Sequence, residues 1–246
     1  MGMLAGKLAL VTGGSRGIGR AIVERLARDG AAVVFSFLQH EAAAGEVVAA
    51  VEAAGGKALA VRADLGRLAE VRRLFDQAEG YLGGLDILVN NASVVVTASV
   101  AEATEQAYDG VMAVNAKGVF FSIQQAARRL RDGGRIVNIS TINTVLPAPG
   151  MAIYAASKAA VEQFTLVAAW ELAGRGITVN TVSPGYTDTD MFRGANPTDA
   201  PERAAAMTPL GRLGQPADVA DVVAFLTGPD ARWLTGQNLR ASGGLA

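Results

Sequence analysis

Short apolar runs alternate with longer amphipathic segments along the chain. Runs with the length of buried strands are Leu8–Val11, Ala32–Phe37, Lys57–Ala63, Leu85–Val89, Arg135–Ile139 and Ile177–Val182. Between the first two runs, Ile18, Ile22, Val23 and Leu26 recur at helical spacing, and similar patterns separate most of the other runs. Strands that are apolar throughout have both faces of their sheet covered, and their alternation with helices indicates parallel pairing. The pattern therefore predicts a doubly wound α/β fold, with helices on both faces of a parallel sheet.

The segment at about 184–216 interrupts this alternation. It contains five of the eight prolines and several glycines. It directly follows the C-terminal end of a predicted strand, which is where ligands bind in open α/β sheets. Long loops in compact domains usually have a function, so we expect a substrate loop here, although a plain surface excursion has the same composition. Nothing along the chain marks a linker, and residues 1–246 are expected to form a single domain.

Composition narrows the classes of function. Of the 246 residues, 50% are hydrophobic, and the formal net charge of −1 gives no electrostatic basis for binding nucleic acid or an anionic membrane surface. The chain has no cysteine and one histidine, which excludes thiol catalysis and makes a metal site unexpected. No signal peptide or membrane helix is recognisable, so a cytoplasmic protein without a membrane partner is expected.

A glycine-rich loop follows the first predicted strand directly. It reads Thr12-Gly13-Gly14-Ser15-Arg16-Gly17-Ile18-Gly19 and leads into a helix. Glycines at such a turn allow the backbone N–H groups of the helix start to approach a pyrophosphate closely. The spacing of Gly13, Gly17 and Gly19 differs from GxGxxG, but its place between the first strand and the first helix indicates a dinucleotide site.

Further motifs in order along the chain resemble those of the short-chain dehydrogenase/reductase family, over essentially its full length. The family's TGxxxGxG loop corresponds to 12–19, NNAG to Asn90-Asn91-Ala92-Ser93, YxxxK to Tyr154 and Lys158, and PG to Pro184-Gly185. Asn115 stands where the family has its catalytic Asn, and 236–244 is similar to its last strand. The resemblance implies a Rossmann-type sheet of about seven strands and an oxidoreductase that acts on CH–OH groups with a nicotinamide cofactor.

Two positions depart from the family pattern. Ser93 replaces the glycine of NNAG, which we expect to adjust the backbone above the cofactor. The family's catalytic Ser lies thirteen positions before the Tyr, and here that position holds Thr141, with Ser140 beside it. Threonine offers the same hydroxyl but has fewer rotamers. We assign the role to Thr141 and keep Ser140 as the alternative.

These residue types suit hydride transfer to a carbonyl group, which also needs a proton. Tyr154 is the expected general acid, but an ordinary tyrosine has a pKa of about 10. Lys158 lies one helical turn further on, and we expect its ammonium to lower that pKa. The family resemblance implies that Lys158 also holds the nicotinamide ribose, that Thr141 polarises the carbonyl, and that Asn115 supports a water-linked proton relay. Each of these residues taken alone has an ordinary structural explanation.

The end of the second predicted strand bears on the choice of cofactor. An enzyme that prefers NAD usually carries a carboxylate there, but this strand ends in Phe35-Ser36-Phe37. Arg16 and the Ser36 hydroxyl are candidate donors to a 2′-phosphate, so we expect NADP(H). By resemblance, Asp64 contacts adenine, Asn90 lies near the adenosine ribose, and Thr187 and Thr189 hold the carboxamide. The full predicted set for the cofactor is Gly13, Ser15, Arg16, Gly17, Ile18, Gly19, Ser36, Phe37, Asp64, Leu65, Asn90, Ala92, Tyr154, Lys158, Pro184, Gly185, Thr187 and Thr189.

The leading functional hypothesis is an NADPH-dependent reductase of a ketone or aldehyde. The alternatives are an NAD(P)-dependent alcohol or sugar dehydrogenase, a 3-oxoacyl reductase, and a non-enzymatic NADP-binding regulator. Expected pocket residues are mostly apolar, which favours an uncharged apolar or aromatic small-molecule substrate; they are Val94, Val95, Val145, Leu146, Met191 and Phe192. The family resemblance also implies a homotetramer.

Overall fold

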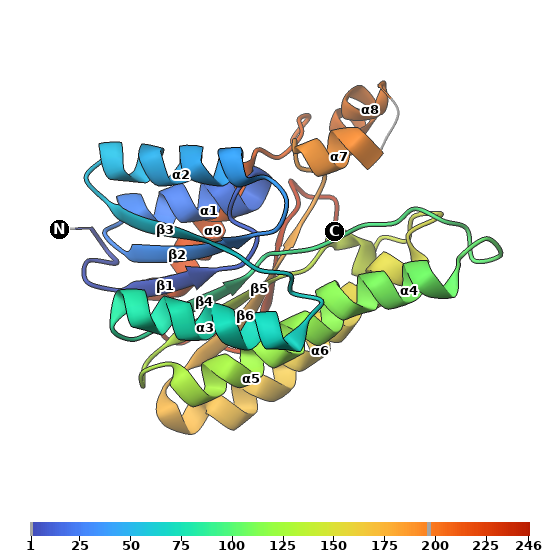
Figure 1. Cartoon of the computed structure of the whole chain (residues 1–246). Helices are drawn as coiled ribbons and strands as arrows, with labels where there is room; N and C mark the ends of the chain where they lie inside the picture. Colours follow the sequence, from blue (N-terminus) through green and yellow to red (C-terminus); the bar gives the residue numbers. More distant parts are fainter. Residues whose placement is uncertain (1, 196–197) are drawn as a thin grey trace.

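A computed structural model describes residues 2–195 and 198–246 and shows a parallel sheet with helices on both faces (Figure 1). The strands are β1 (Leu8–Val11), β2 (Ala32–Phe37), β3 (Lys57–Arg62), β4 (Ile87–Asn90), β5 (Arg135–Ile139), β6 (Thr178–Pro184) and β7 (Asn238–Ala241). The α-helices in the described ranges are α1 (Gly17–Arg28), α2 (Glu41–Ala53), α3 (Leu68–Leu82), α4 (Glu105–Met112), α5 (Val119–Arg129), α6 (Ala152–Leu172), α7 (Asp190–Ala195), α8 (Ala200–Met207) and α9 (Pro216–Thr227).

The sheet has seven strands in the order β3-β2-β1-β4-β5-β6-β7, and every neighbouring pair is parallel. The predicted doubly wound fold is therefore confirmed. The order reverses between β1 and β4, which places a crevice at the carboxyl ends of these strands. The glycine-rich loop leaves β1 at this point.

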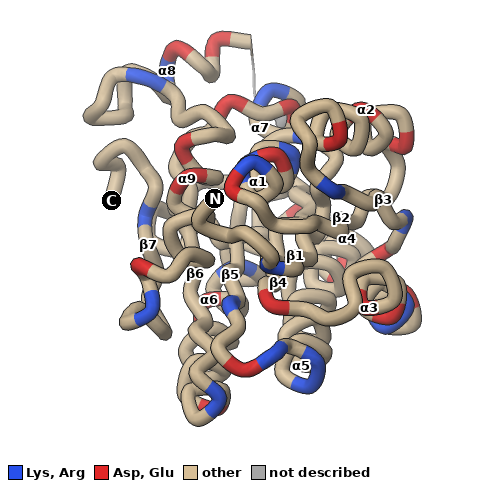
Figure 2. The backbone as a smooth tube through the Cα atoms, turned by 90° about the vertical axis from the view of Figure 1, so that its left-hand side faces the viewer, with Lys and Arg blue, Asp and Glu red and all other residues tan. Residues whose placement is uncertain are grey.

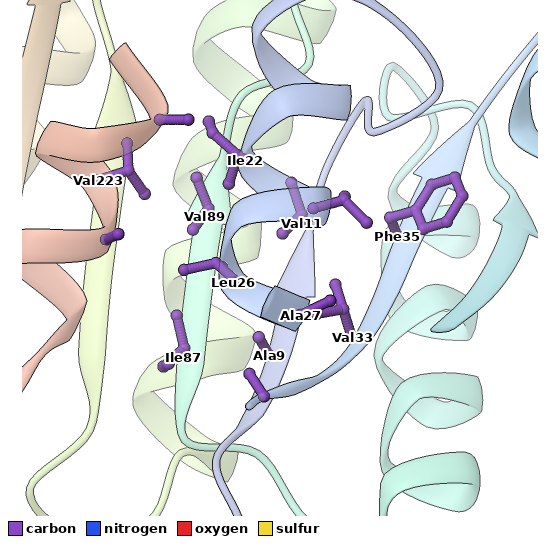
Figure 3. Packing of buried hydrophobic residues seen from close by; sticks show 14 of the residues in the cluster. Ala9, Val11, Ile22, Leu26, Ala27, Val33, Phe35, Ile87, Val89 and Val223 are labelled. Atoms are coloured by element: carbon purple, nitrogen blue, oxygen red, sulfur yellow. The ribbon is translucent and has the colours of Figure 1, made fainter. Parts of the chain in front are cut away.

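Side chains alternate along each strand and build one core on each face of the sheet. On one face, Ala9 and Val11 of β1 pack with Ile22 and Leu26 of α1 and with Val223 of α9 (Figure 3). Residues of α2 belong to the same core. Leu10, between them, packs into the other core with residues of α3, α5 and α6. This alternation explains why the strands are apolar at consecutive positions.

The predicted bounds hold with small shifts at the ends of three strands, and the last strand, β7, is shorter than the predicted 236–244. β3 ends one residue earlier than expected, β4 runs 87–90 rather than 85–89, and β6 extends to Pro184. The segment 184–216 contains the two short helices α7 and α8 and is not one continuous loop; residues 196 and 197 lie outside the described residues. The proline and glycine content hid these helices because each is only one or two turns long.

Charged positions are spread over the surface of the protein. In the view of Figure 2, Lys and Arg positions lie among Asp and Glu positions on the same elements. Many of them form ion pairs on or between helices, for example Arg20 with Glu24 and Arg129 with Glu79. Within residues 2–195 and 198–246, no helix combines the length and the apolar character needed to cross a bilayer.

Candidate active site

A cavity of about 540 Å³ lies at the carboxyl ends of the strands. Its lining comes from the loops after β1, β2, β3, β4, β5 and β6 and from the start of α6. Of the residues predicted from sequence, the cavity brings together the glycine-rich loop, Thr141, Tyr154, Lys158 and the residues that follow β6. Asn90 and Asn115 do not line it, and their positions are described below.

Glycine is required at two points of the loop after β1. Gly13 has a φ of +68°, and a Cβ there would lie 2.9 Å from the Cα of Ala92. A Cβ at Gly19 would lie 1.9 Å from the carbonyl oxygen of Gly13, so α1 packs directly on the turn. The first turn of α1 has no acidic residue, and its N-cap, Arg16, makes no capping hydrogen bond through its side chain. The positive end of this helix is therefore open to an anion.

The strand β4 and the residues after it hold the loop in place. Thr12 Oγ1 accepts hydrogen bonds from Asn91 N at 2.9 Å and from Ala92 N at 3.0 Å. In return, Asn91 Nδ2 donates to the carbonyl oxygens of Thr12 and Gly13. These bonds tie together the first two motifs recognised in the sequence, which are separated by more than seventy residues.

Tyr154 and Lys158 lie at the start of α6, as the YxxxK spacing predicts. Lys158 Nζ lies 5.9 Å from the centroid of the Tyr154 ring and donates a hydrogen bond of 2.9 Å to Ile139 O. The side chain of Lys158 is almost completely buried, and this burial lowers the pKa of Lys158 to about 8.

Tyr154 is half-buried, and the pKa of its phenol is raised above the ordinary value of 10.0 because burial disfavours the phenolate. The hydroxyl groups of Thr141 and Ser93 act in the opposite direction and lower the pKa of this phenol, but burial outweighs them. The pKa of the phenol is therefore raised overall, contrary to the expected fall, and a lowering by Lys158 stays a prediction. Sequence spacing located the cation but did not reveal how deeply the phenol lies.

The structure separates the two candidate hydroxyls after β5. Ser140 Oγ donates to Glu162 Oε1 at 2.7 Å, so its single hydrogen is committed to a carboxylate. Thr141 Oγ1 accepts a hydrogen bond from Asn143 N at 3.3 Å and faces Tyr154. A hydroxyl that accepts a hydrogen bond still has its hydrogen to donate. The geometry favours Thr141 over Ser140 as a donor to a bound molecule.

Asn115 lies in a π-helical turn, Ala113–Gly118, between α4 and α5, and its side chain is fully buried. Asn115 Oδ1 accepts from Val94 N at 2.9 Å, and Nδ2 donates to Val94 O at 2.8 Å. Nδ2 also donates to Ser157 Oγ at 3.1 Å. The amide is thus occupied by protein groups. The N–H of Val119, which would bond the Asn115 carbonyl in a regular α-helix, donates to Ala116 O instead.

The end of β2 forms one side of the cavity. Ser36 is buried, and its Oγ accepts a hydrogen bond of 3.0 Å from Gly13 N. Phe37 is only 8% exposed and belongs to the core on the α1 face. Arg16 is exposed, and its guanidinium lies 4.0 Å from the carboxylate of Asp190 at the start of α7. Lining residues that the sequence analysis missed here are Leu38, Gln39 and His40.

The loops after β3 and β4 differ in how they meet the cavity. Asp64 and Leu65 line it, and Asp64 Oδ1 accepts a hydrogen bond from Gly66 N at 2.9 Å. Asn90 turns into the sheet instead, where its Nδ2 donates to Asn138 Oδ1 at 2.8 Å. Asn91, which the sequence analysis assigned no separate role, lines the cavity. The alternation of side chains along β4 decides which of the two asparagines faces the loop.

The end of β6 and the residues after it close the cavity on the other side. Pro184, Gly185, Thr187 and Thr189 all line it. A Cβ at Gly185 would lie 2.9 Å from Ser242 Cα, so glycine is needed where this strand passes the C-terminal segment. Thr189 Oγ1 accepts a hydrogen bond from Phe192 N in the first turn of α7. Of the six predicted pocket residues, Val94, Val95, Met191 and Phe192 line the cavity, whereas Val145 and Leu146 do not.

Comparisons with known proteins agree with this geometry. A family model described as enoyl-(acyl carrier protein) reductase matches residues 13–246. An uncharacterized oxidoreductase of Methylorubrum extorquens is 47% identical over 247 residues, and the match covers 100% of this chain and 100% of that protein. A hydroxynaphthalene reductase-like protein of Metarhizium brunneum is 42% identical over 254 residues, which cover 98% of this chain and 95% of that protein.

Two solved structures are similar over nearly their whole length. A short chain dehydrogenase from Burkholderia cenocepacia in complex with NADP has a TM-score of 0.92 and 44% identity, with 99% of both chains covered. The angucycline C-6 ketoreductase LanV with bound NADP has a TM-score of 0.94 and 43% identity, with 99% of this chain and 97% of that chain covered. From the matching family model, these relatives and the shared fold, the chain belongs to the short-chain dehydrogenase/reductase family of oxidoreductases.

Proposed function

We propose that the protein is an NADPH-dependent carbonyl reductase, which reduces a ketone or aldehyde to the alcohol and also catalyses the reverse reaction. The observation that carries this proposal is the meeting of Thr141, Tyr154 and Lys158 in the cavity that the glycine-rich loop enters. Thr141 then supplies a hydroxyl donor, Tyr154 an acid and Lys158 a cation in the same cavity as the expected dinucleotide site.

The residues present fit a dinucleotide. Gly13 and Gly19 have no side chains that could cover the backbone of the loop. The first turn of α1 has no acidic residue and no side-chain cap, so its N–H groups suit a pyrophosphate. Lys158 is buried at the cavity wall and has one acceptor, Ile139 O, within the described part of the chain. An ammonium has three donors, so two remain for the hydroxyls of the nicotinamide ribose. When bound, NADPH supplies the hydride.

The proton comes from Tyr154 in this account. Thr141 donates a hydrogen bond to the carbonyl oxygen, which makes the carbonyl carbon a better hydride acceptor. As negative charge develops on that oxygen, the Tyr154 O–H bond breaks and its proton moves to the oxygen, which becomes the alcohol. The Lys158 ammonium stabilises the phenolate that remains. Ser140 has no direct part, because its hydrogen is held by Glu162.

We place the role of Asn115 in its backbone carbonyl. Its side-chain amide is occupied by Val94 and Ser157, so the amide is not free to hold a relay water. The π-helical turn draws the N–H of Val119 away to Ala116 O. The carbonyl of Asn115 is then a candidate acceptor for a water that returns a proton toward Lys158 and Tyr154.

The end of β2 supports NADP(H) over NAD(H). No carboxylate lies there to bind a ribose 2′-OH or repel a 2′-phosphate. Arg16 is exposed at the cavity, and its partner Asp190 is exposed and at the limit of ion-pair distance, so the guanidinium is easily redirected. His40 and Gln39 add two polar side chains at the same edge. The two similar solved structures hold NADP.

The substrate side of the cavity favours an uncharged carbonyl compound with an apolar or aromatic body. Val94, Val95, Ile142, Met151 and Phe192 line it, and among the described residues Lys158 is the basic side chain that lines the cavity in contact with the Tyr154 ring. Apolar walls contribute most to the binding of rings and chains. The names of the relatives, a hydroxynaphthalene reductase-like protein and an angucycline ketoreductase, are compatible with an aromatic substrate.

We also propose a homotetramer. The outer face of α5 and α6 exposes apolar side chains of unusual size for a surface: Phe120 is 45% exposed, Leu166 44% and Trp170 87%. Exposed apolar patches of this kind mark protein interfaces. Light scattering on Trp170→Glu, beside the wild type, tests this, because a charge in the interface should dissociate the assembly. An unchanged mass for the variant contradicts an interface at this helix face.

The activity is tested by following NADPH and NADH oxidation with a panel of aromatic ketones, aliphatic ketones, aldehydes and a 3-oxoacyl thioester. The proposal expects turnover with NADPH and aromatic or apolar ketones. Preference for the thioester favours a 3-oxoacyl reductase, and oxidation of sugars with NAD favours a sugar dehydrogenase. Tight NADPH binding without turnover of any class of substrate would indicate a cofactor-binding regulator.

A further inference from the structure

Ser93 lines the candidate active site at the position where the NNAG motif has a glycine. A glycine has no side chain, so the motif assigns no chemical role to this position. Its Oγ is buried and, among the residues that the structure describes, has no hydrogen-bond partner. A buried hydroxyl without a partner is costly, and such groups in folded proteins call for an explanation. Ser93 lines the same cavity as Thr141 and Tyr154.

The Ser93 hydroxyl faces the phenol of Tyr154 without completing a hydrogen bond of ordinary geometry. It acts on the phenol in the same direction as Thr141, because both favour the phenolate. Lys158 is the charged group whose ammonium lies over this ring. Ser93 is therefore within reach of the one atom of the site that gains negative charge when the proton leaves.

Both neighbours of Ser93 in the chain are fixed. On one side, Asn91 N and Ala92 N donate to Thr12 Oγ1. On the other, both backbone groups of Val94 are bonded to the amide of Asn115. A donor held on a rigid backbone segment needs little reorganisation when charge appears beside it, which is the arrangement that stabilises transition states best.

We propose that Ser93 is an additional catalytic residue, whose hydroxyl donates a hydrogen bond to Tyr154 Oη once that oxygen has released its proton. The inference rests on the proposed role of Tyr154 as proton donor. In the reduction, the proton moves from Tyr154 to the substrate oxygen, and Ser93 O–H then turns to the phenolate. In the oxidation, the same bond keeps the phenolate available as a base.

The test is the ultraviolet absorbance of tyrosinate as a function of pH, without cofactor and with NADP⁺ bound. Subtracting the absorbance of Tyr154→Phe from that of the wild type at each pH isolates the titration of Tyr154 from that of the other tyrosines. In the Ser93→Ala background, the same subtraction uses the single variant and the double variant Ser93→Ala/Tyr154→Phe. We expect Ser93→Ala to raise the titration midpoint of Tyr154 by about one pH unit, the scale of a lost hydrogen bond to a charged group. The pH profile of alcohol oxidation should move in the same direction.

Ser122→Ala is the matched control. Ser122 Oγ on α5 is also buried and has no hydrogen-bond partner in the described ranges, but it does not line the cavity. We expect this variant to leave the Tyr154 titration unchanged. Removing an unpaired hydroxyl should not lower the melting temperature in either variant. Ser93→Gly, which also lacks the hydroxyl, replaces Ser93→Ala if the latter does not fold.

An unchanged midpoint and pH profile in Ser93→Ala overturns the inference, and so does a lower melting temperature with an unchanged titration, because Ser93 is then a structural residue. These outcomes leave the proposed function intact as long as Tyr154→Phe is inactive. Conversely, an active Tyr154→Phe overturns the proposed function, while a shifted titration in Ser93→Ala still shows the contact with the phenol.

Discussion

The side chain of Asn115 holds the backbone of Val94 through two hydrogen bonds, one to its N–H at 2.9 Å and one from Nδ2 to its carbonyl at 2.8 Å. This contact joins the helix between α4 and α5 to the loop after β4. The loop carries Ser93 and part of the substrate-side lining, so its position affects the reacting groups.

Asn115→Ala should therefore lower both stability and activity. The substitution leaves the N–H and carbonyl of Val94 without their partners in a partly buried setting, which costs about 1–3 kcal/mol in the free energy of unfolding. Urea unfolding and the kcat of ketone reduction are the measurements. If Asn115→Ala had the same free energy of unfolding as the wild type, the prediction would be contradicted, because water would then satisfy the Val94 backbone as well as the amide does.

Gly19→Ala should weaken cofactor binding. A Cβ at this position lies 1.9 Å from Gly13 O and 2.5 Å from Asn91 Nδ2, so the turn and its clamp must move. We expect the Kd for NADPH, measured by fluorescence titration, to rise by at least about tenfold, or about 1.4 kcal/mol.

Gly45→Ala is the control for this substitution. Gly45 lies within α2, and a Cβ there meets nothing within 4 Å. Alanine in the middle of a helix is more favourable than glycine by about 0.5–1 kcal/mol, so this variant should be slightly more stable with an unchanged Kd. Equal effects of the two substitutions on the Kd would remove the special role of Gly19.

The choice of cofactor is tested by Arg16→Ala and Leu38→Asp. Phe37→Asp is a poor variant because Phe37 is part of the core, whereas Leu38 is 43% exposed and lines the cavity. Loss of a charge-assisted hydrogen bond and gain of a repulsive carboxylate should together raise the Kd for NADPH by about ten- to a hundredfold. The Kd for NADH should change much less or improve. A wild-type protein that prefers NADH would contradict the NADP assignment.

Burial of Lys158 predicts how the stability of the cofactor-free protein depends on pH. Its pKa is about 8 in the folded protein and ordinarily 10.5, so between these values the unfolded chain binds more protons than the folded one. The contribution of Lys158 to the free energy of unfolding should then rise with pH in this window.

Lys158→Met removes this contribution. The free energy of unfolding is measured with urea from pH 7 to about 9.5. We expect the value for the wild type to rise relative to the value for the variant as the pH rises. The difference between the two proteins is the relevant quantity, because other groups titrate in both. A difference that stays constant, or that falls with pH, contradicts a lowered pKa of Lys158.

Thr141 and Ser140 are distinguished by single substitutions. Thr141→Ala should depress kcat because the donor to the carbonyl is lost, whereas Thr141→Ser should keep or raise it. Ser140→Ala should have a smaller effect, because its hydroxyl bonds Glu162 rather than a substrate. The reverse order of the two alanine variants would move the catalytic role to Ser140.

Much of the fold and most of the cavity lining follow from the sequence alone. Apolar strand runs predicted the parallel sheet, because burial on both faces leaves no alternation. Motif spacing placed Tyr154 and Lys158 on one helix face and the glycine-rich loop at the end of β1. These features depend on local periodicity, which the sequence displays directly.

The remaining features depend on burial and on contacts between distant segments. The direction of the pKa of Tyr154 is set by depth, and the inward turn of Asn90 by the register of β4. The engagement of Asn115 with Val94, and the hydroxyl of Ser93 beside the phenol, join residues that no spacing rule connects. Val145 and Leu146 follow Thr141 closely in sequence but fall outside the cavity lining, because a short helical turn, Ile142–Thr144, redirects the chain.

The central claim is that Tyr154 delivers the proton in an NADPH-dependent reduction. Its most direct test is kcat for ketone reduction by Tyr154→Phe, measured together with the Kd for NADPH. Phenylalanine preserves the ring and removes only the acidic hydroxyl, so we expect kcat to fall by about 10²–10⁴-fold while the Kd stays within about twofold of the wild type. A variant that retains near wild-type kcat would contradict the account.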